Sequence, residues 1–180
     1  MVYILLGTGF EEMEALTPVD LLRRAGISVM TVGINGKNIT GGHGITVEAD
    51  ITLGQMDLTA MDMIVLPGGL GGVASIRSSQ EALDAVSFAY DNGKFVAAIC
   101  AGPTVLADLH ITDKCNAVCY PGCESSMGSA DIHADKACVQ DGNIITAASA
   151  GCAIPFALSL ISALKGSEIA ESIRQQIVIR

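Results

Sequence analysis

The sequence predicts a single-domain α/β protein in which a mainly parallel, doubly wound sheet is sandwiched by helices. Apolar runs of strand length recur along the chain, at residues 2–6, 61–66 and 95–99. Helical patterns lie between them, and strands that alternate with helices favour parallel crossovers. A length of 180 residues fits one domain over 1–180, with room for a substantial core.

The first third of the chain predicts two strands, a helix and a small β-excursion. Residues 2–6 form the first strand and residues 27–32, before Gly33, form the second. Between them, apolar residues spaced by three and four predict a helix that ends near residue 25. Pro18 lies inside this helix and predicts a kink or a later start. Asn35-Gly36 indicates a tight hairpin turn within an excursion over residues 34–49.

The rest of the chain continues the alternation of strands and helices. Ser78-x-x-Glu81 is a capping box that opens a helix, and the strand at residues 95–99 follows it. Val118 and Cys119 predict a short strand, followed by a long loop over residues 121–137. A strand at residues 143–147 and helices at residues 153–165 and 167–174 complete the pattern.

Charge and hydropathy exclude several classes of protein. A net charge of −9 argues against a nucleic-acid partner and against an anionic membrane surface. The apolar segment at residues 2–6 is too short for a signal sequence, and no run approaches the ~20 residues of a membrane helix. We therefore expect a cytoplasmic protein with no membrane partner.

Six cysteines are many for this chain, yet their spacing does not predict a metal site. Cys115, Cys119 and Cys123 lack the C-x2-C pairs of zinc sites, and Pro121-Gly122 would break a helical ligand face. Without an export signal, structural disulfides are not expected. Gly7-x-Gly9-x-x-Glu12 resembles a dinucleotide fingerprint but has glutamate in place of the third glycine, so we expect no cofactor.

The most informative stretch is the segment 95–104, in which an apolar strand runs into Cys100. Ala98-x-Cys100-x-Gly102 has the spacing of a nucleophile elbow, and Pro103 suits the first turn of a helix. A thiol at a helix N-terminus is predicted to ionise more easily than usual. The alternative is a buried cysteine at the end of a core strand.

Two further segments follow strands and could meet Cys100 at one edge of the sheet. Pro67-Gly-Gly-Leu-Gly-Gly72 could bring backbone N–H groups close to a ligand, or could only make a sharp turn. Glu11, Glu12 and Glu14 crowd the first turn of the first helix, where capping is the simplest role for all three. Glu14 could instead face inward over the sheet edge.

Together these segments predict a thiolate, a carboxylate and backbone donors, which suit addition to an activated carbonyl. A cysteine hydrolase would also need a histidine base. His110 lies far along the chain from Cys100, and His43 and His133 serve only if their loops fold inward; His43 is more simply a loop histidine. A peptidase is therefore disfavoured.

Several motifs resemble the ThiJ/PfpI superfamily, and specifically its DJ-one-like branch, that of the parkinsonism-associated deglycase. The motifs are Ala97-Ala-Ile-Cys-Ala-Gly-Pro-Thr104, Val65-Leu-Pro-Gly-Gly69, Glu11-Glu-Met-Glu14 and Val19-Asp-Leu-Leu-Arg-Arg-Ala-Gly26. The resemblance covers essentially the whole chain. It implies a flavodoxin-like fold, a homodimer, and no cofactor or metal.

The resemblance also implies roles for individual residues. Cys100 matches an oxidation-prone nucleophile and Glu14 a protonated glutamate that contacts its sulfur, while Gly68, Gly69 and Ala101 would supply backbone donors to an oxyanion. The chain departs from the branch at several places, among them Ala148-Ser149-Ala150, which replaces a loop containing arginine and proline. Tyr120-Pro121 replaces a histidine before a proline, and His43 stands where the branch has an arginine that can bind an anion.

These departures leave the substrate contacts open. Tyr120 could donate a hydrogen bond to a substrate or pack in the core, and His43 is the other possible contact.

The sequence thus supports a glyoxalase or deglycase that acts on small reactive carbonyl compounds. The alternative is a non-enzymatic redox sensor or chaperone in which Cys100 is oxidised to a sulfinate. A hydrolase is the third and disfavoured hypothesis.

Overall fold

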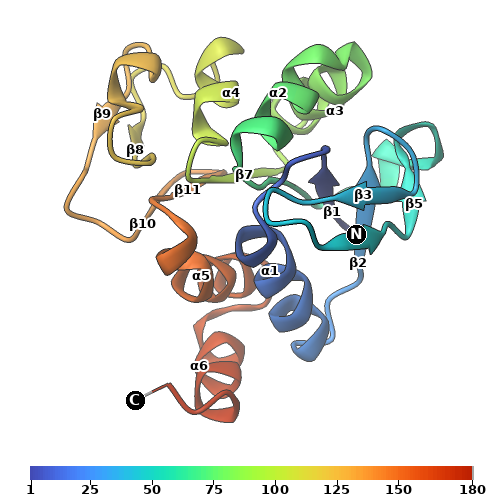
Figure 1. Ribbon diagram of the computed structural model, residues 1–180. Helices are drawn as coiled ribbons and strands as arrows, with labels where there is room; N and C mark the ends of the chain where they lie inside the picture. The colour runs from blue at the N-terminus through green and yellow to red at the C-terminus, as the bar shows by residue number, and fades with distance from the viewer. Residues whose placement is uncertain (180) are drawn as a thin grey trace.

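A computed structural model describes residues 1–179 and shows one α/β domain (Figure 1). Its central sheet has seven strands in the order β10-β11-β7-β6-β1-β2-β5. All neighbouring pairs are parallel except β10 and β11. The strands span β1 Val2–Leu6, β2 Val29–Gly33, β5 Ile51–Thr52, β6 Met63–Leu66, β7 Phe95–Ile99, β10 Cys138–Asp141 and β11 Ile144–Ala147.

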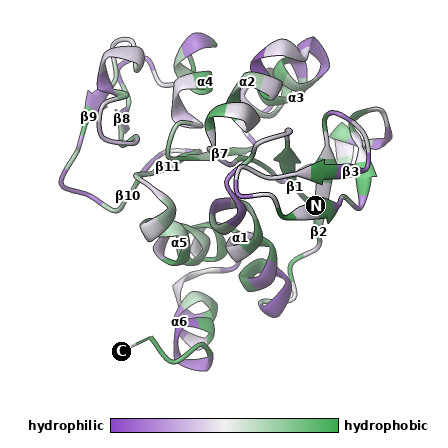
Figure 2. Cartoon of the chain, in the orientation of Figure 1, coloured by the Kyte–Doolittle hydropathy of each residue, from purple (hydrophilic) through white to green (hydrophobic). Residues whose placement is uncertain are grey.

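Helices cover both faces of this sheet. The helices are α1 Glu12–Arg24, α2 Leu70–Ser78, α3 Gln80–Asp91, α4 Pro103–Asp108, α5 Ala153–Lys165 and α6 Ser167–Gln176. One apolar core packs α1, α5 and α6 on one face, and a second packs α2, α3 and α4 on the other, as Figure 1 shows. In Figure 2, β1 is green whereas purple residues lie on outer helices and loops. The predicted doubly wound sandwich is therefore confirmed.

The strand order places a topological switch point beside the first strand. From β1 the chain winds outward through β2, then returns to β6 on the other side of β1 and winds outward through β7 and β11. Crossovers on opposite sides leave a crevice beyond the carboxyl ends of β1 and β6. The segments that follow β1, β6 and β7 therefore meet at one edge of the sheet.

Two small sheets lie outside the central one. β3 Asn38–Thr40 and β4 Thr46–Glu48 form an antiparallel hairpin, and β8 Asn116–Ala117 pairs in parallel with β9 Asp131–Ile132. Single turns of 3-10 helix lie at η1 Leu53–Gln55, η2 Leu58–Ala60, η3 Glu124–Ser126 and η4 Ala150–Cys152. Within residues 1–179, no helix combines the length and apolar character needed to cross a bilayer.

Four local predictions were wrong. The hairpin turn lies between β3 and β4, at residues 41–45, whereas Asn35-Gly36 only bends the chain from β2 into β3. Val118 and Cys119 follow β8 and are not in a strand. Of the two alternatives for Pro18, the later start was wrong: α1 begins at Glu12 and continues through this residue. The sequence pattern did not predict β10, or α2, whose helical pattern is obscured by glycines, and the predicted loop over residues 121–137 contains η3 and β9.

The cap of α3 is the fourth difference. Ser79, not Ser78, is the N-cap, and its side chain accepts the Ala82 N–H at 3.3 Å. Ser78 is the last residue of α2, and its hydroxyl donates to the Ser75 carbonyl at 3.0 Å. Two helices joined at one residue leave only Ser79 with the extended backbone that an N-cap needs.

We expect Ser79→Ala to lower the free energy of unfolding by about 1 kcal/mol, because it removes the acceptor for an unpaired helix N–H. Ser78→Ala is the matched control and should change it by a few tenths of a kcal/mol at most, since alanine is a better helix former. Urea denaturation of the three proteins measures both differences. Equal losses in the two variants would contradict this assignment of the cap.

Candidate functional site

Cys100 lies at a strained turn between β7 and α4. Its φ of +66° is in the left-handed region, which a residue with a side chain adopts at a cost of about 1–3 kcal/mol. Backbone hydrogen bonds hold it on both sides: its N–H donates to the Ala147 carbonyl at 2.9 Å, and its carbonyl accepts the Tyr120 N–H at 2.8 Å. The nucleophile-elbow geometry predicted for this cysteine is present.

Glu14 faces inward from the first turn of α1, and only 1% of its surface is exposed. Its Oε2 accepts the Gly68 N–H at 2.8 Å, while Oε1 is buried and has no hydrogen-bond partner among the described residues. A Cβ on Gly68 would lie 2.5 Å from Glu14 Oε2 and 2.8 Å from Cys100 Cβ. The carboxyl group, the glycine loop and the cysteine are therefore in contact.

Burial and mutual repulsion set the charges of this pair. Burial raises the pKa of Glu14 to about 7, although hydrogen bonds from Cys100 and Gly68 oppose the shift. Burial and then the negative charge of Glu14 raise the pKa of the Cys100 thiol to about 12. The predicted ease of ionisation was thus wrong, because burial and the negative charge of Glu14 outweigh the effect of the helix N-terminus.

The two acids therefore behave as one coupled unit. Because two adjacent negative charges repel each other, the sulfur can ionise only when Glu14 holds a proton. In that state the protonated carboxyl can donate a hydrogen bond to the thiolate. A pKa of about 7 also places Glu14 where a group can both accept and release protons near neutral pH.

Two of the three predicted backbone donors have no oxygen acceptor among the described residues. Neither Gly69 nor Ala101 donates its N–H to an oxygen atom among residues 1–179, and the Ala101 N–H instead lowers the pKa of the Cys100 sulfur. Gly69 is the N-cap of α2 with a φ of +82°. The N–H of Gly68 is not free, because Glu14 accepts it. The prediction of Gly68 as an oxyanion donor was therefore wrong.

The three glutamates of the first turn have three different roles. Glu11 is the N-cap and accepts the Glu14 N–H at 2.7 Å. Glu12 is buried and anchors the β3–β4 loop: it accepts the His43 N–H at 2.8 Å, and its other oxygen lies 2.8 Å from His43 Nδ1. Capping thus holds only for Glu11. The sequence feature that could have indicated this role of Glu12 is the glycine-rich segment 41–44, which lies against the Glu12 carboxyl group.

This arrangement also explains the environment of His43. Hydrogen bonds from His43 lower the pKa of Glu12 against the opposing effect of its burial, and the Glu12 carboxylate raises the pKa of His43. The ligand atoms of Glu11, Glu12 and His43 lie within 4.8 Å of one another. They are the described residues best placed to hold a metal ion, but both carboxylate oxygens of Glu12 are already paired with His43.

No histidine contacts Cys100 among the described residues. His43 pairs with Glu12, His110 with Asp113 at 3.1 Å, and His133 Nε2 lies 2.7 Å from Asn116 Oδ1. The histidine base of a cysteine hydrolase is thus not present at the site. Tyr120 touches Cys100 only through its backbone, and 48% of its surface is exposed, so it is not a core residue.

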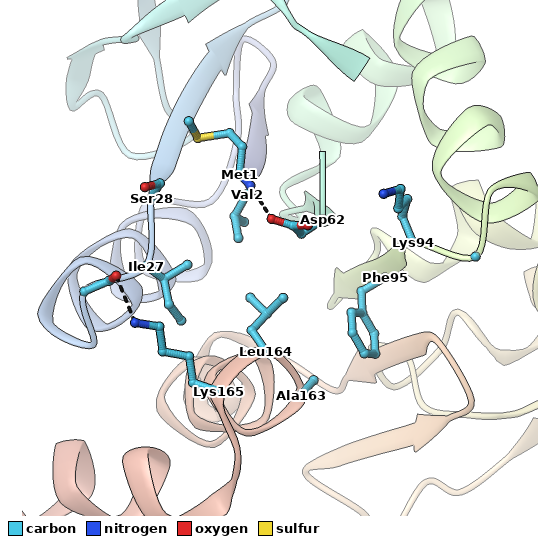
Figure 3. Close-up of a pocket in the computed structure, with 12 residues that line it drawn as sticks. Met1, Val2, Ile27, Ser28, Asp62, Lys94, Phe95, Ala163, Leu164 and Lys165 are labelled. Atoms are coloured by element: carbon cyan, nitrogen blue, oxygen red, sulfur yellow. Dashed lines mark hydrogen bonds and ion pairs between the residues drawn. The ribbon is translucent and has the colours of Figure 1, made fainter. Parts of the chain in front are cut away.

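A hollow lies at the opposite edge of the sheet from Cys100, where β1 and β7 begin (Figure 3). Ile27, Phe95 and Leu164 extend toward it, and Lys165 at its rim donates to the Gly26 carbonyl at 3.1 Å. Its lining contains no cysteine or histidine. We therefore assign the chemistry to the Cys100 edge, where a nucleophile, an acid and free donors converge.

Comparison with known proteins agrees with this fold. The profile of the DJ-1/PfpI family matches residues 1–163. The chain is 34% identical to protein dj-1beta of Drosophila melanogaster over 98% of this chain and 95% of that protein. It is 29% identical to a deglycase of Pyrococcus abyssi over 91% of this chain and 99% of that protein. The crystal structure of Drosophila melanogaster DJ-1beta superposes with a TM-score of 0.93, at 33% identity and with 99% and 97% of the two chains covered.

The buried acid predicts a pH-dependent stability. The folded-state pKa of Glu14, about 7, lies above its ordinary value of 4.5, so its contribution is favourable below pH 4.5 and is lost as pH rises through 7. Glu14→Gln keeps the shape without this loss. We expect the variant to gain roughly 3 kcal/mol of unfolding free energy relative to the wild type between pH 4.5 and pH 7 and above.

Urea denaturation at a series of pH values measures this difference. The exposed Glu48→Gln is the matched control and should follow the wild type throughout. A constant difference between Glu14→Gln and the wild type would show that Glu14 is ionised with an ordinary pKa.

Proposed function

The chain belongs to the DJ-1/PfpI family, and from this premise we propose that it is a cofactor-free cysteine enzyme of the glyoxalase or deglycase type. Its substrates are 2-oxoaldehydes or their adducts. The observation that carries the proposal is the contact between buried Glu14, Gly68 and Cys100, with the N–H groups of Gly69 and Ala101 left free.

The chemistry begins with addition of the Cys100 thiolate to the aldehyde carbon. A carbon–sulfur bond forms, and the Gly69 and Ala101 N–H groups stabilise the oxyanion until it takes a proton from Glu14. The product of this step is a hemithioacetal. Glu14, now ionised, removes the proton from the former aldehyde carbon and returns it to the neighbouring carbon, while the hydroxyl proton passes to the neighbouring carbonyl oxygen. The resulting thioester is hydrolysed by water, which gives a hydroxy acid and restores the thiol.

The relatives support the enzymatic interpretation. The Pyrococcus abyssi protein carries the name deglycase, and 91% of this chain aligns with it. An exposed Tyr120 and the loop histidine His43 are the side chains that we propose as substrate contacts at the rim. All six cysteines are free, which supports a reducing compartment such as the cytoplasm.

A redox sensor is the second candidate function, and the same pair supports it. A protonated Glu14 beside Cys100 could donate a hydrogen bond to a sulfinate at that position. Turnover of a 2-oxoaldehyde distinguishes the enzyme from the redox sensor, because a sensor requires only the oxidation of Cys100. The hydrolase hypothesis has no support from the described histidines.

We also propose a homodimer, which the family resemblance implies. A groove between α1, the β3–β4 loop and the start of α5 is lined by apolar side chains. Met13, Ile45 and Ile154 in this groove are 56%, 54% and 39% exposed. Large apolar side chains that gather on one face mark a protein interface, and a second copy is the occupant that we propose.

The first functional test measures lactate formed from methylglyoxal without glutathione. Cys100→Ser should lower kcat/KM at least about 1,000-fold because the nucleophile is lost, and Glu14→Gln about 100- to 10,000-fold because the proton shuttle is lost. Cys115→Ser is the matched control and should retain wild-type activity. A folded, reduced wild type without turnover would exclude the glyoxalase, and full activity in Glu14→Gln would exclude the shuttle.

The dimer is tested by sedimentation equilibrium. Ile154→Asp places a charge in the apolar groove and should weaken self-association at least about tenfold. Leu70→Asp is the matched control, because Leu70 is 88% exposed and lies on α2, outside the groove. A monomeric wild type at micromolar concentration, or an unchanged Ile154→Asp dimer, would contradict the proposed interface.

A further inference from the structure

Cys123 lies on a turn that is bonded directly to the backbone of Cys100. The Tyr120 N–H donates to the Cys100 carbonyl at 2.8 Å, and the Cys123 N–H donates to the Tyr120 carbonyl at 2.9 Å. The second bond closes a four-residue β-turn with Pro121 and Gly122 at its centre. Two hydrogen bonds therefore connect the two cysteines across 23 positions of the sequence.

The residue types at the centre of the turn set the position of Cys123. Proline sets the backbone of the first central position, and Gly122 has a φ of +98°, the conformation that the second position of a type II turn requires. Cys123 is half-buried and packs both against the core that contains Ala101 and against the small cluster around Cys119. Cys100 packs against the other core, so Cys123 approaches the elbow from the side of the sheet that α4 covers.

The Cys123 sulfur is also close enough to act electrostatically on the nucleophile. Its charge raises the pKa of the Cys100 thiol, and no other cysteine has this effect among the described residues. Both thiols are free, and neither is fully buried. Tyr120, at the start of the turn, is half-exposed and makes no side-chain hydrogen bond among residues 1–179, so its side chain does not tie the turn to the rest of the structure.

We propose that Cys123 is the resolving thiol for Cys100. After a hydroperoxide oxidises Cys100 to a sulfenic acid, Cys123 attacks that sulfur and closes a reversible intramolecular disulfide. The chain would then act as a thiol peroxidase, in addition to the activity proposed above.

The steps balance in atoms and electrons. The Cys100 thiolate attacks the terminal oxygen of the hydroperoxide: an S–O bond forms, the O–O bond breaks, and the alcohol leaves with a proton that Glu14 supplies. Sulfur is oxidised by two electrons and the peroxide is reduced by two. Cys123 then forms the S–S bond as the S–O bond breaks, and hydroxide leaves as water with the Cys123 thiol proton. An external dithiol reduces the disulfide by exchange and becomes a disulfide itself.

The turn also gives a physical reason why the oxidation of Cys100 is reversible. A sulfenic acid that meets a nearby thiol forms a disulfide, whereas one without a partner is oxidised further to a sulfinate. Closing the bond requires Cα atoms roughly 4.4–6.8 Å apart. The exposed Tyr120–Cys123 turn, rather than the fixed elbow at Cys100, is the part that can move to reach this distance.

The experiment uses the reduced chain, two equivalents of hydrogen peroxide, and alkylation with N-ethylmaleimide followed by mass spectrometry. The wild type should lose two hydrogens and two alkylation sites, and peptide mapping should link Cys100 to Cys123. Cys123→Ser and Cys123→Ala should instead add two oxygens at Cys100, with a sulfinate yield about tenfold above that of the wild type. Cys115→Ser is the matched control and should form the disulfide normally.

Peroxide turnover coupled to dithiothreitol oxidation provides the second readout. It should fall at least about tenfold in both Cys123 variants, while their turnover of methylglyoxal stays unchanged. A wild type that forms sulfinate as readily as the Cys123 variants, or that links Cys100 to Cys119, would overturn the proposal. An inactive methylglyoxal assay with an intact Cys100–Cys123 disulfide would overturn the glyoxalase alone.

Discussion

The structure depends on one buried contact, in which the Glu14 carboxyl accepts the Gly68 N–H and lies against Cys100. An acid removed from water is costly to ionise, so this contact fixes the order in which the site loses its protons. It also explains the composition of the loop, because only glycine fits between the carboxyl and the cysteine at position 68. The packing that closes the site and the chemistry that it can perform have the same physical origin.

The topology of the sheet makes this contact possible. Glu14, Gly68 and Cys100 are far apart in the sequence, but each follows a parallel strand of the same sheet. Strands that wind outward from a switch point leave their carboxyl ends at one crevice. The same edge receives the Tyr120–Cys123 turn, whose hydrogen bond to Cys100 adds a second thiol to the neighbourhood of the nucleophile.

Local patterns predicted most elements of the fold. The residue bounds of β1, β7 and α5 agree with their apolar runs and flanking glycines, because buried strands and amphipathic helices leave a direct record in the sequence. Patterns failed where two signals overlapped. Ser78 and Ser79 could both begin a helix, and only the end of α2 at Ser78 selects Ser79 as the cap. The Asn35-Gly36 signal was real, but the neighbouring strands pair elsewhere.

The sequence by itself determined the α/β fold, the elbow at Cys100 and the candidacy of Glu14, since these follow from periodicity and spacing within short segments. Only the tertiary structure decided which atoms are free to act. It showed that Glu14 occupies the Gly68 N–H, that Glu12 anchors His43, and that the Cys100 thiol is hard to ionise beside a buried carboxylate. Burial and hydrogen bonding depend on groups brought together from distant segments, and no local pattern records which partner a polar group finds.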